Sequence, residues 1–271
     1  MPLILKEQNF TSATRKYVDT PFQGIPGEKD VHVWITDLKV PHFIHLNFLE
    51  SLLSQDELNR AEKFKFPKDK KQFVIAHAYL RLILSKYTGC LPNKIEYEFG
   101  RYGKPFLKKQ PGSMQHLSFN MSHAGTLGAY AIANKVEVGI DIEYIKPHAT
   151  MLDMSTMNFV LTKNEREALN KGGDHQRIRN FLNIWTSKEA FLKGIGVGLN
   201  YPPHRIEISQ QLTQPRKILT TCDMRTASTW CLYTLDCPKT YVGTVAVNCP
   251  SRVLHYLHNP LHFFNQKLFV F

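Results

Sequence analysis

Three sequence patterns occur twice along this chain of 271 residues, in the same order and at a nearly constant spacing. An alternating apolar stretch begins at 31 and again at 136. A helix-start motif, Ser or Thr followed three residues later by Glu, begins at 54 and at 162. A third, strand-like segment begins at 94 and at 205, so the offset stays between 105 and 111 residues. Coincidence is the alternative, because strands and helices commonly alternate, but the repetition favours a duplicated unit.

Each copy of the helix-start motif precedes apolar residues at helical spacing, over 73–87 and over 178–192. Alternating apolar segments follow in both copies and are typical of strands in antiparallel sheets. The sequence therefore predicts an α+β fold of two similar halves, residues 31–135 and 136–249. Each half is expected to hold a helix packed on a small, mostly antiparallel sheet.

The two ends of the chain lie outside this repeat. Residues 1–30 are interpreted as an N-terminal extension. The tail, residues 250–271, is apolar but interrupted by Pro260, and we expect it to pack back as a short helix. Three histidines share one face of that expected helix and form a weak metal candidate, since no acid or cysteine is near: His255, His258 and His262.

The composition is that of a globular protein, with 43% apolar and 21% charged residues. The start lacks the pattern of a signal peptide, and no apolar run approaches the roughly 20 residues that a membrane span needs. The five cysteines form no Cys-x-x-Cys motif and are odd in number, which is typical of reduced intracellular thiols. We therefore expect a cytoplasmic protein without a membrane partner.

The chain is strongly basic, with a formal net charge of +11, and its lysines and arginines gather at 60–71. Such a balance indicates an acidic partner, which could be a nucleic acid, a phosphorylated ligand or an acidic protein. A solvated basic face without a partner is the alternative.

Two carboxylates interrupt the apolar segment "VGIDIE" at 138–143. Because successive side chains of a strand point to opposite faces, Asp141 and Glu143 share one face. Burying two charges on one face is costly unless they are paired or bind a metal ion.

A third acid, Glu189, falls within the apolar stripe of the helix expected at 178–192, one turn after Trp185. An ion pair with a neighbouring Lys or Arg could explain any one of these acids. Three acids on the inward faces of two elements favour a divalent cation, and oxygen ligands favour Mg²⁺ with a phosphorylated substrate. The glycines of "GIGVG", 194–198, follow this helix, so they are interpreted as its end and not as a dinucleotide-binding loop.

A group of polar side chains, Asn120, Ser122 and His123, lies between two expected strands. The serine hydroxyl and the imidazole could donate hydrogen bonds to phosphate oxygens. Lys104, in the turn "RYGKPFL" at 101–107, could add a positive charge. An ordinary turn is the alternative for both segments.

Taken together, the chain resembles the 4′-phosphopantetheinyl transferase superfamily, in its longer, monomeric Sfp-like type. Four stretches carry the resemblance in the order and spacing of that family: "GKP" (103–105), "FNMSHAG" (119–125), "VGIDIE" (138–143) and "WTSKEAFLKGIGVGL" (185–199). A looser likeness extends from residue 50 to 247. The resemblance implies a monomeric pseudo-dimer with the site in the cleft between its halves.

The resemblance also implies an activity: transfer of the phosphopantetheine arm of coenzyme A to a serine of an apo carrier protein, with release of 3′,5′-ADP. It implies Asp141, Glu143 and Glu189 as magnesium ligands and Lys193 as a contact of the pyrophosphate. Lys193 would stabilise the phosphate charge, while Glu189 or a metal-held water would take the serine proton. Four residues are implied to line the coenzyme A phosphates, of which the first matches a loose motif: Arg60, Lys104, Ser122 and His123.

Carrier proteins of this family are typically acidic helical bundles, so the basic segment at 60–71 would suit such a partner. One alternative is another Mg-dependent enzyme that cleaves a pyrophosphate without a protein acceptor. A basic nucleic-acid-binding module is a second alternative, but it leaves the three inward acids unexplained, and we expect no nucleic-acid partner.

Overall fold

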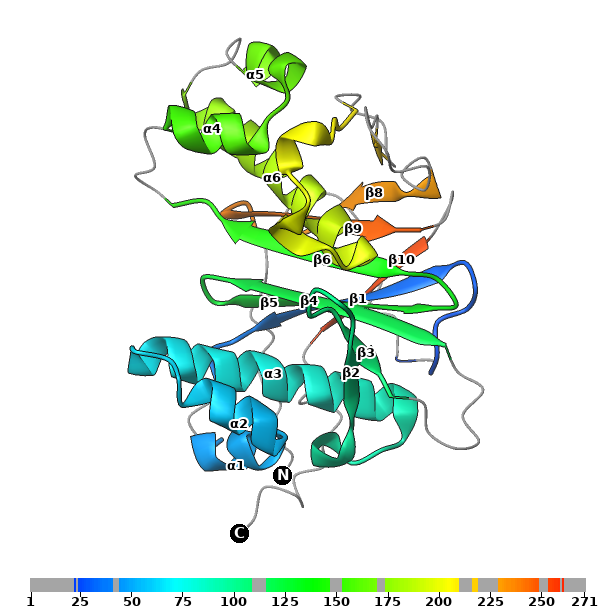
Figure 1. The fold of residues 1–271 in the computed structure, drawn as a ribbon. Helices are drawn as coiled ribbons and strands as arrows, with labels where there is room; N and C mark the ends of the chain where they lie inside the picture. The colour runs from blue at the N-terminus through cyan, green and yellow to red at the C-terminus, as the bar shows by residue number, and fades with distance from the viewer. Residues whose placement is uncertain are drawn as a thin grey trace, which may run out of the picture.

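The computed structural model describes residues 22, 24–40, 44–108, 116–146, 153–169, 174–209, 216–218, 229–248, 253–258 and 260. Two halves, each a sheet with a long helix on its outer face, stack sheet against sheet in this part of the chain (Figure 1). None of the described helices is long and apolar enough to cross a membrane.

The first half contains two long antiparallel strands, which a tight turn joins. A long helix covers these strands. Its elements are β1 (Asp30–Asp37), α1 (Leu46–Ser51), α2 (Gln55–Ala61), α3 (Pro67–Thr88), β2 (Tyr97–Phe99), β3 (Pro105–Leu107), β4 (Leu117–Ala124) and β5 (Leu127–Asn134). The second half comprises β6 (Val138–Tyr144), α4 (Met154–Val160), α5 (Lys163–Leu169), α6 (Asp174–Ile195), β7 (Arg216–Lys217), β8 (Cys231–Thr234) and β9 (Tyr241–Val247). Among the described residues, three short 3₁₀ turns lie at Pro92–Lys94, Gly198–Asn200 and Pro203–Arg205, and β10 (Val253–His258) is the last strand.

The two halves share one topology. In the first sheet β1 pairs antiparallel with β5 and β5 with β4, and in the second β6 pairs with β9 and β9 with β8. A short capped helix precedes the long helix in both, as α2 precedes α3 and α5 precedes α6. The predicted α+β fold with two similar, sheet-bearing halves is confirmed.

Both predicted helix-start motifs form capping boxes. Ser54 and Glu57 each bond the other's backbone N–H at the start of α2, and Thr162 and Glu165 do the same at the start of α5. Each glutamate then meets a base from the long helix of its own half. Glu57 accepts a hydrogen bond from Arg81, and Glu165 pairs with Lys188 at 2.5 Å.

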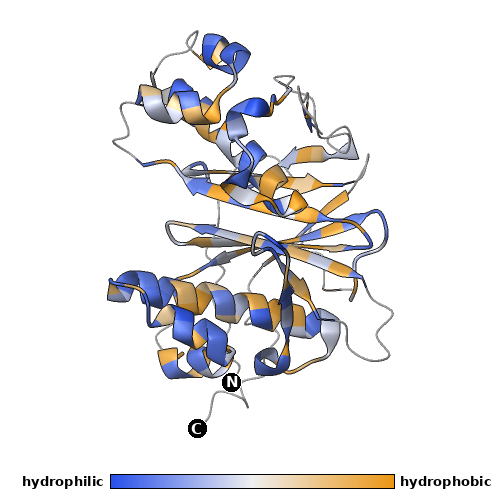
Figure 2. Ribbon diagram, viewed as in Figure 1, coloured by the Kyte–Doolittle hydropathy of each residue, from blue (hydrophilic) through white to orange (hydrophobic). Residues whose placement is uncertain are grey.

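The apolar contact between the two sheets joins the halves. Alternate residues of β1 and β5, such as Val33 and Ala131, pack against Val138, Ile140 and further residues of the second sheet. The other face of the first sheet packs on α3. Figure 2 shows apolar residues running through the strands of both sheets. Burial of both faces explains why these strands are apolar almost throughout.

The helix predicted for the tail is wrong within the described residues. Residues 253–258 form β10, which pairs parallel with β1 in a register that sets Asp30 opposite Val253. β1 would otherwise be an edge strand with unpaired backbone groups, and β10 supplies their partners. His255 therefore lies on a strand and contacts Asp30 at 3.0 Å, while His262 is outside the described residues.

The third repeated pattern is weaker in the structure than the sequence predicts. Of the segment 94–99 only Tyr97–Phe99 form a strand. In the segment 205–210 a 3₁₀ turn ends at Arg205, and the described residues after it contribute one isolated bridge, between Ile208 and Ile218.

His32 makes the stability of the first half sensitive to pH. Its Nδ1 lies 2.8 Å from the hydroxyl of Tyr87 on α3. Burial, with a contribution from His255 and against that of Asp30, lowers the pKa of His32 from 6.5 to about 4. Between these values the unfolded chain binds more protons, so the free energy of unfolding should fall as the pH drops from 6.5 toward 4. Urea titrations at several pH values in this window give the unfolding free energy of the wild type and of His32→Gln. A plot of that free energy against pH should be shallower for the variant, and equal slopes of the two plots would contradict the assignment.

Candidate active site

The carboxylates of β6 point away from the contact between the sheets and toward α6. Val138, Ile140 and Ile142 pack into that contact. The alternate residues Asp141 and Glu143 instead meet side chains of α6. The predicted common face of the two acids is thus the face that the long helix covers.

Gly139 allows α6 to lie against β6. A Cβ atom at this position would stand 1.9 Å from the carbonyl oxygen of Ala190 and 2.5 Å from the nitrogen of Gly194. Any larger residue would therefore push the helix away from the strand and separate the acids of β6 from the side chains of α6.

Three residues of α6, spaced one turn apart, face these acids. Lys193 donates to Asp141 Oδ1 at 2.7 Å, and the Trp185 indole donates to Glu143 Oε1 at 3.1 Å. Glu189 lies between them in sequence, so its position in the predicted apolar stripe directs it to the same strand.

β4 of the first half completes the site. Ser122 donates its hydroxyl hydrogen to Asp141 Oδ1 at 2.9 Å and lies 3.1 Å from Lys193 Nζ. Two positions earlier, Asn120 accepts the backbone N–H of Ile140 at 3.0 Å. These contacts link the halves at the site, and they come from a strand, whereas the sequence had suggested a junction between strands.

The charged forms of Glu143 and Glu189 are destabilised at this site. Burial, then the charge of Asp141, raises the pKa of Glu189 to about 7, although Lys193 opposes this shift. Burial and Asp141 also raise the pKa of Glu143. Negative charge in this space therefore exceeds what Lys193 compensates, and a further cation would be stabilised there.

Two carboxylate oxygens of this group are buried without a hydrogen-bond partner, Asp141 Oδ2 and Glu189 Oε1. Such orphaned oxygens are the donors that a hard divalent cation takes. Among the described residues, no group of three or more His, Cys, Asp or Glu side chains is placed so that it could hold a metal ion. The chemistry of the two orphaned oxygens alone suits an ion such as Mg²⁺, which takes oxygen ligands and holds few of them from protein.

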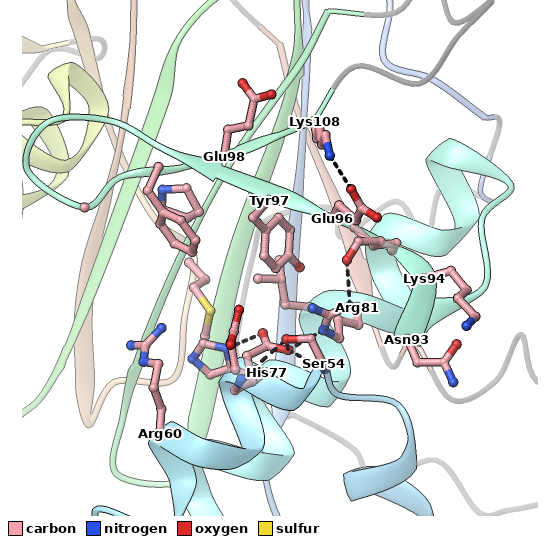
Figure 3. Close-up of a pocket in the computed structure, with 18 of the residues that line it drawn as sticks. Ser54, Arg60, His77, Arg81, Asn93, Lys94, Glu96, Tyr97, Glu98 and Lys108 are labelled. Carbon is pink, nitrogen blue, oxygen red and sulfur yellow. Dashed lines mark hydrogen bonds and ion pairs between the residues drawn. The ribbon is translucent and has the colours of Figure 1, made fainter.

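An open cleft of about 920 Å³, part of whose wall is drawn in Figure 3, adjoins this acidic centre, because Ser122 and Lys193 line the cleft and contact Asp141. Its wall includes Ser122, His123 and Lys193 at one end and Arg60 from α2. Four of the predicted phosphate contacts thus line one cavity. His123 reaches solvent within the cleft, yet burial by the walls, with the charges of His77 and Lys193, lowers the pKa of its imidazole.

Lys104 does not belong to this wall. Its ammonium group is buried behind the β2–β3 hairpin, where it pairs with Glu137 and donates to the carbonyl of Gly194 at 2.5 Å. In this arrangement the side chain ties the hairpin to the end of α6. The prediction that it lines a phosphate site is not matched by its position.

Sequence reasoning missed several residues that the structure places at the cleft or at the acidic centre. Glu57 and His77 line the same cleft, and Trp185, expected only as part of an apolar stripe, orients Glu143. A histidine within the apolar stripe of the first long helix was the one available signal for His77. Nothing local to the sequence marks Glu57 as more than a helix cap.

The fold and the site define a pseudo-dimeric α+β enzyme with an acidic centre beside a cleft that both basic and acidic side chains line. Two family models match the chain: the 4′-phosphopantetheinyl transferase superfamily over residues 137–246, and the 4′-phosphopantetheinyl transferase N-terminal family over residues 40–135.

Relatives extend this match over most of the chain. The 4′-phosphopantetheinyl transferase HetI of Nostoc sp. is 34% identical over 218 residues, which cover 80% of this chain and 87% of that protein. The 4′-phosphopantetheinyl transferase gsp of Aneurinibacillus migulanus is 26% identical over 197 residues, 73% of each chain. The chain belongs to the 4′-phosphopantetheinyl transferase superfamily, and the resemblance found in its sequence is confirmed.

Among solved structures, a holo-(acyl-carrier-protein) synthase of Bacillus anthracis in complex with CoA (3′,5′-ADP) is 22% identical, with a TM-score of 0.34. The match covers 41% of this chain and 94% of that chain.

Proposed function

We propose that this protein transfers the 4′-phosphopantetheine arm of coenzyme A to a serine hydroxyl of an apo carrier protein and releases 3′,5′-ADP. The observation that carries the proposal is the meeting of Lys193, Asp141 and Ser122 at the end of the cleft, beside Glu143 and Glu189. A centre of this kind combines positive charge for a pyrophosphate with carboxylates for a metal ion.

The bond changes of this reaction balance without a further reactant. The serine oxygen forms a bond to the phosphorus that carries the pantetheine arm, and the bridging bond of the pyrophosphate breaks. The electron pair of that bond leaves with 3′,5′-ADP. The serine proton needs an acceptor, for which the chain offers Glu189; a water molecule held at the metal is the alternative.

We assign the metal to Asp141, Glu143 and Glu189, with Mg²⁺ as the ion that their oxygens suit. When bound, Mg²⁺ would neutralise charge on the phosphate oxygens. Lys193 stabilises the same charge from α6. Ser122 and His123 hold coenzyme A phosphates, for which the one hydroxyl hydrogen of Ser122 would turn from Asp141 to a phosphate oxygen, and Arg60 meets an anionic group further along the cleft.

The decisive experiment mixes the protein with coenzyme A, Mg²⁺ and a panel of apo carrier proteins, and records intact masses. Transfer appears as the mass of the phosphopantetheine arm on the carrier. Release of 3′,5′-ADP without any carrier modification would instead favour an enzyme that hydrolyses the pyrophosphate.

The carrier is proposed to dock on a basic surface beside the cleft, which we call the lysine patch. It comprises the exposed side chains of Lys63, Lys65, Lys68 and Lys71 between Arg60 and the body of α3. Lys70 is engaged by Glu62 at 2.6 Å. Phe64 and Phe66 are exposed on the same segment and add apolar area. An acidic helical carrier has the charge that such a surface attracts.

Salt should slow the reaction with the carrier more than transfer to a small uncharged acceptor peptide. The Debye length falls from about 10 Å at 0.1 M to about 3 Å at 1 M, which screens attraction over the lysine patch. At low salt, reversal of Lys63, Lys65 and Lys68 to Glu should lower kcat/KM for the carrier about tenfold or more and leave the Kd of coenzyme A unchanged.

The matched control reverses three exposed lysines elsewhere, Lys29, Lys39 and Lys239, with the same change in net charge. An equal loss in both triple variants would show that net charge matters and the patch does not. An unchanged carrier rate in the patch variant would place docking on another surface.

We also infer that the protein acts as a monomer in the cytoplasm. Both parts of the site come from one chain, since β4 and α6 meet across the two halves. Cys90 and Cys237 are free thiols, which suits a reducing compartment.

A further inference from the structure

The capping glutamates of the two halves differ in one contact. Glu57 and Glu165 both close a capping box, and both pair with a base from the following long helix. The Oε1 atom of Glu165 accepts the backbone N–H of Ile208 at 3.0 Å. The Oε1 atom of Glu57 instead lies 2.9 Å from Nδ1 of His77.

The hydrogen bond to Glu57 fixes the ring of His77. Although burial opposes ionisation, the hydrogen bond from His77 and the charge of Arg81 lower the pKa of Glu57 to about 2. An ionised carboxylate only accepts hydrogen bonds, so Nδ1 of His77 carries the shared proton. Arg81 is held in turn by the carbonyls of Pro92 at 2.6 Å and Ile95 at 3.0 Å.

The ring of His77 supports two further side chains at the cleft. It stacks on Phe73, with ring centroids 4.0 Å apart and an interplanar angle of 29°. The guanidinium of Arg60 lies over the ring of Phe73, 5.3 Å from its centroid. Figure 3 shows His77 and Arg60 on neighbouring parts of the cleft wall. A continuous series of contacts therefore runs from Glu57 through His77 and Phe73 to Arg60.

The second half shows that the fold does not require this series. The long helices begin 107 residues apart, at Pro67 and Asp174, and the short capped helices begin 108 apart, at Gln55 and Lys163. At these offsets the second half has none of the three side chains, since Phe73, His77 and Arg60 correspond to Asn180, Ile184 and Ala168. The capping box and the buried ion pair form there all the same. The series occurs only in the half whose capping glutamate lines the cleft.

We propose that Glu57 and His77 are positioning residues that hold Phe73, and through it the guanidinium of Arg60, ready to meet an anionic group of coenzyme A. This inference rests on the proposed function. An arginine loses rotamer freedom when it binds an anion, and a ring already placed beneath its guanidinium reduces that loss. Arg60 itself contacts the ligand, whereas His77 acts through Phe73.

A double-mutant cycle tests the proposal, with the Kd of coenzyme A measured by calorimetry on Arg60→Ala, His77→Gln and the double variant. Glutamine can keep a hydrogen bond to Glu57 but removes the stacking ring. Each single variant should weaken binding about five- to tenfold, with kcat on saturating coenzyme A changed little. The double variant should bind no more weakly than Arg60→Ala alone, because both changes remove one contact.

Two results would overturn the proposal. If the double variant weakens coenzyme A binding by the product of the two single-variant factors, His77 contributes independently of Arg60. Unchanged affinity in His77→Gln, with a lowered Tm, would show that the histidine only stabilises the fold. The variant His77→Phe keeps a stacking ring but lacks the hydrogen bond to Glu57, so its affinity should lie between those of His77→Gln and the wild type.

His32→Gln is the matched control, because His32, like His77, is a histidine of the first half bonded to a neighbour, here Tyr87. It lies outside the cleft wall and should leave the Kd unchanged. If the wild type binds coenzyme A and modifies carriers, but His77→Gln binds coenzyme A equally well, only the positioning role is contradicted. If the wild type neither binds coenzyme A nor modifies carriers, the proposed function is contradicted as well.

Discussion

Replacing Asp141 by alanine should lower the rate of transfer at least about a thousandfold while the protein stays folded. Asp141 accepts hydrogen bonds from Lys193 and Ser122, and its second oxygen is buried without a partner. Its loss therefore removes both the proposed metal ligand and the group that orients the lysine. Folding should tolerate the change, because the charge of Asp141 disfavours ionisation of Glu189 and Glu143.

Turnover of apo carrier protein, followed by intact mass, checks this prediction, and circular dichroism with a thermal melt checks the fold. Glu167→Gln, at an exposed acid of α5, is the control and should match the wild type. Near-normal turnover in a folded Asp141→Ala protein would remove this residue from the proposed metal site.

Replacing Lys188 by alanine should cost about 3–5 kcal/mol of unfolding free energy. Lys188 and Glu165 are both fully buried and lie 2.5 Å apart, and the lysine also donates to the carbonyl of Val160 at 2.7 Å. Removing the ammonium group leaves the carboxylate of Glu165 charged in the interior without its partner. Urea titration measures the loss.

The double variant Lys188→Met with Glu165→Leu separates the charge effect from packing. Because it buries no unpaired charge, it should recover part of the stability lost in Lys188→Ala. A loss below about 1 kcal/mol in the single variant would mean that water or a local rearrangement solvates the carboxylate.

The acidic centre could be predicted from the sequence because its signal is local. Asp141 and Glu143 stand at alternate positions of an apolar strand, and Glu189 stands within an apolar helical stripe. A charged residue at a position that the periodicity directs inward is visible without any knowledge of the partner element. The two strand-and-helix halves were visible for the same reason, since each element carries its own period.

Contacts between distant segments could not be predicted in this way. Lys104 lies at the tip of a short hairpin, and only the approach of Gly194, ninety residues later, turns it inward to a buried ion pair. β10 is a strand because β1 offers it an open edge, and the short apolar tail fits helix and strand alike. The stacking of Phe73 between His77 and Arg60 depends on how α2 lies on α3.

The two halves share one topology but differ in the side chains between sheet and helix, and this difference bears on how many ligands one polypeptide binds. Toward its long helix, β6 presents Asp141 and Glu143, whereas β1 fills the corresponding space with His32 and Trp34, both bonded to Tyr87. A symmetric pair of such units would offer two equivalent centres, but here one unit supplies the acids and the other much of the ligand wall. On the proposed function we therefore expect each polypeptide to take up a single coenzyme A, and neither unit alone to bind it.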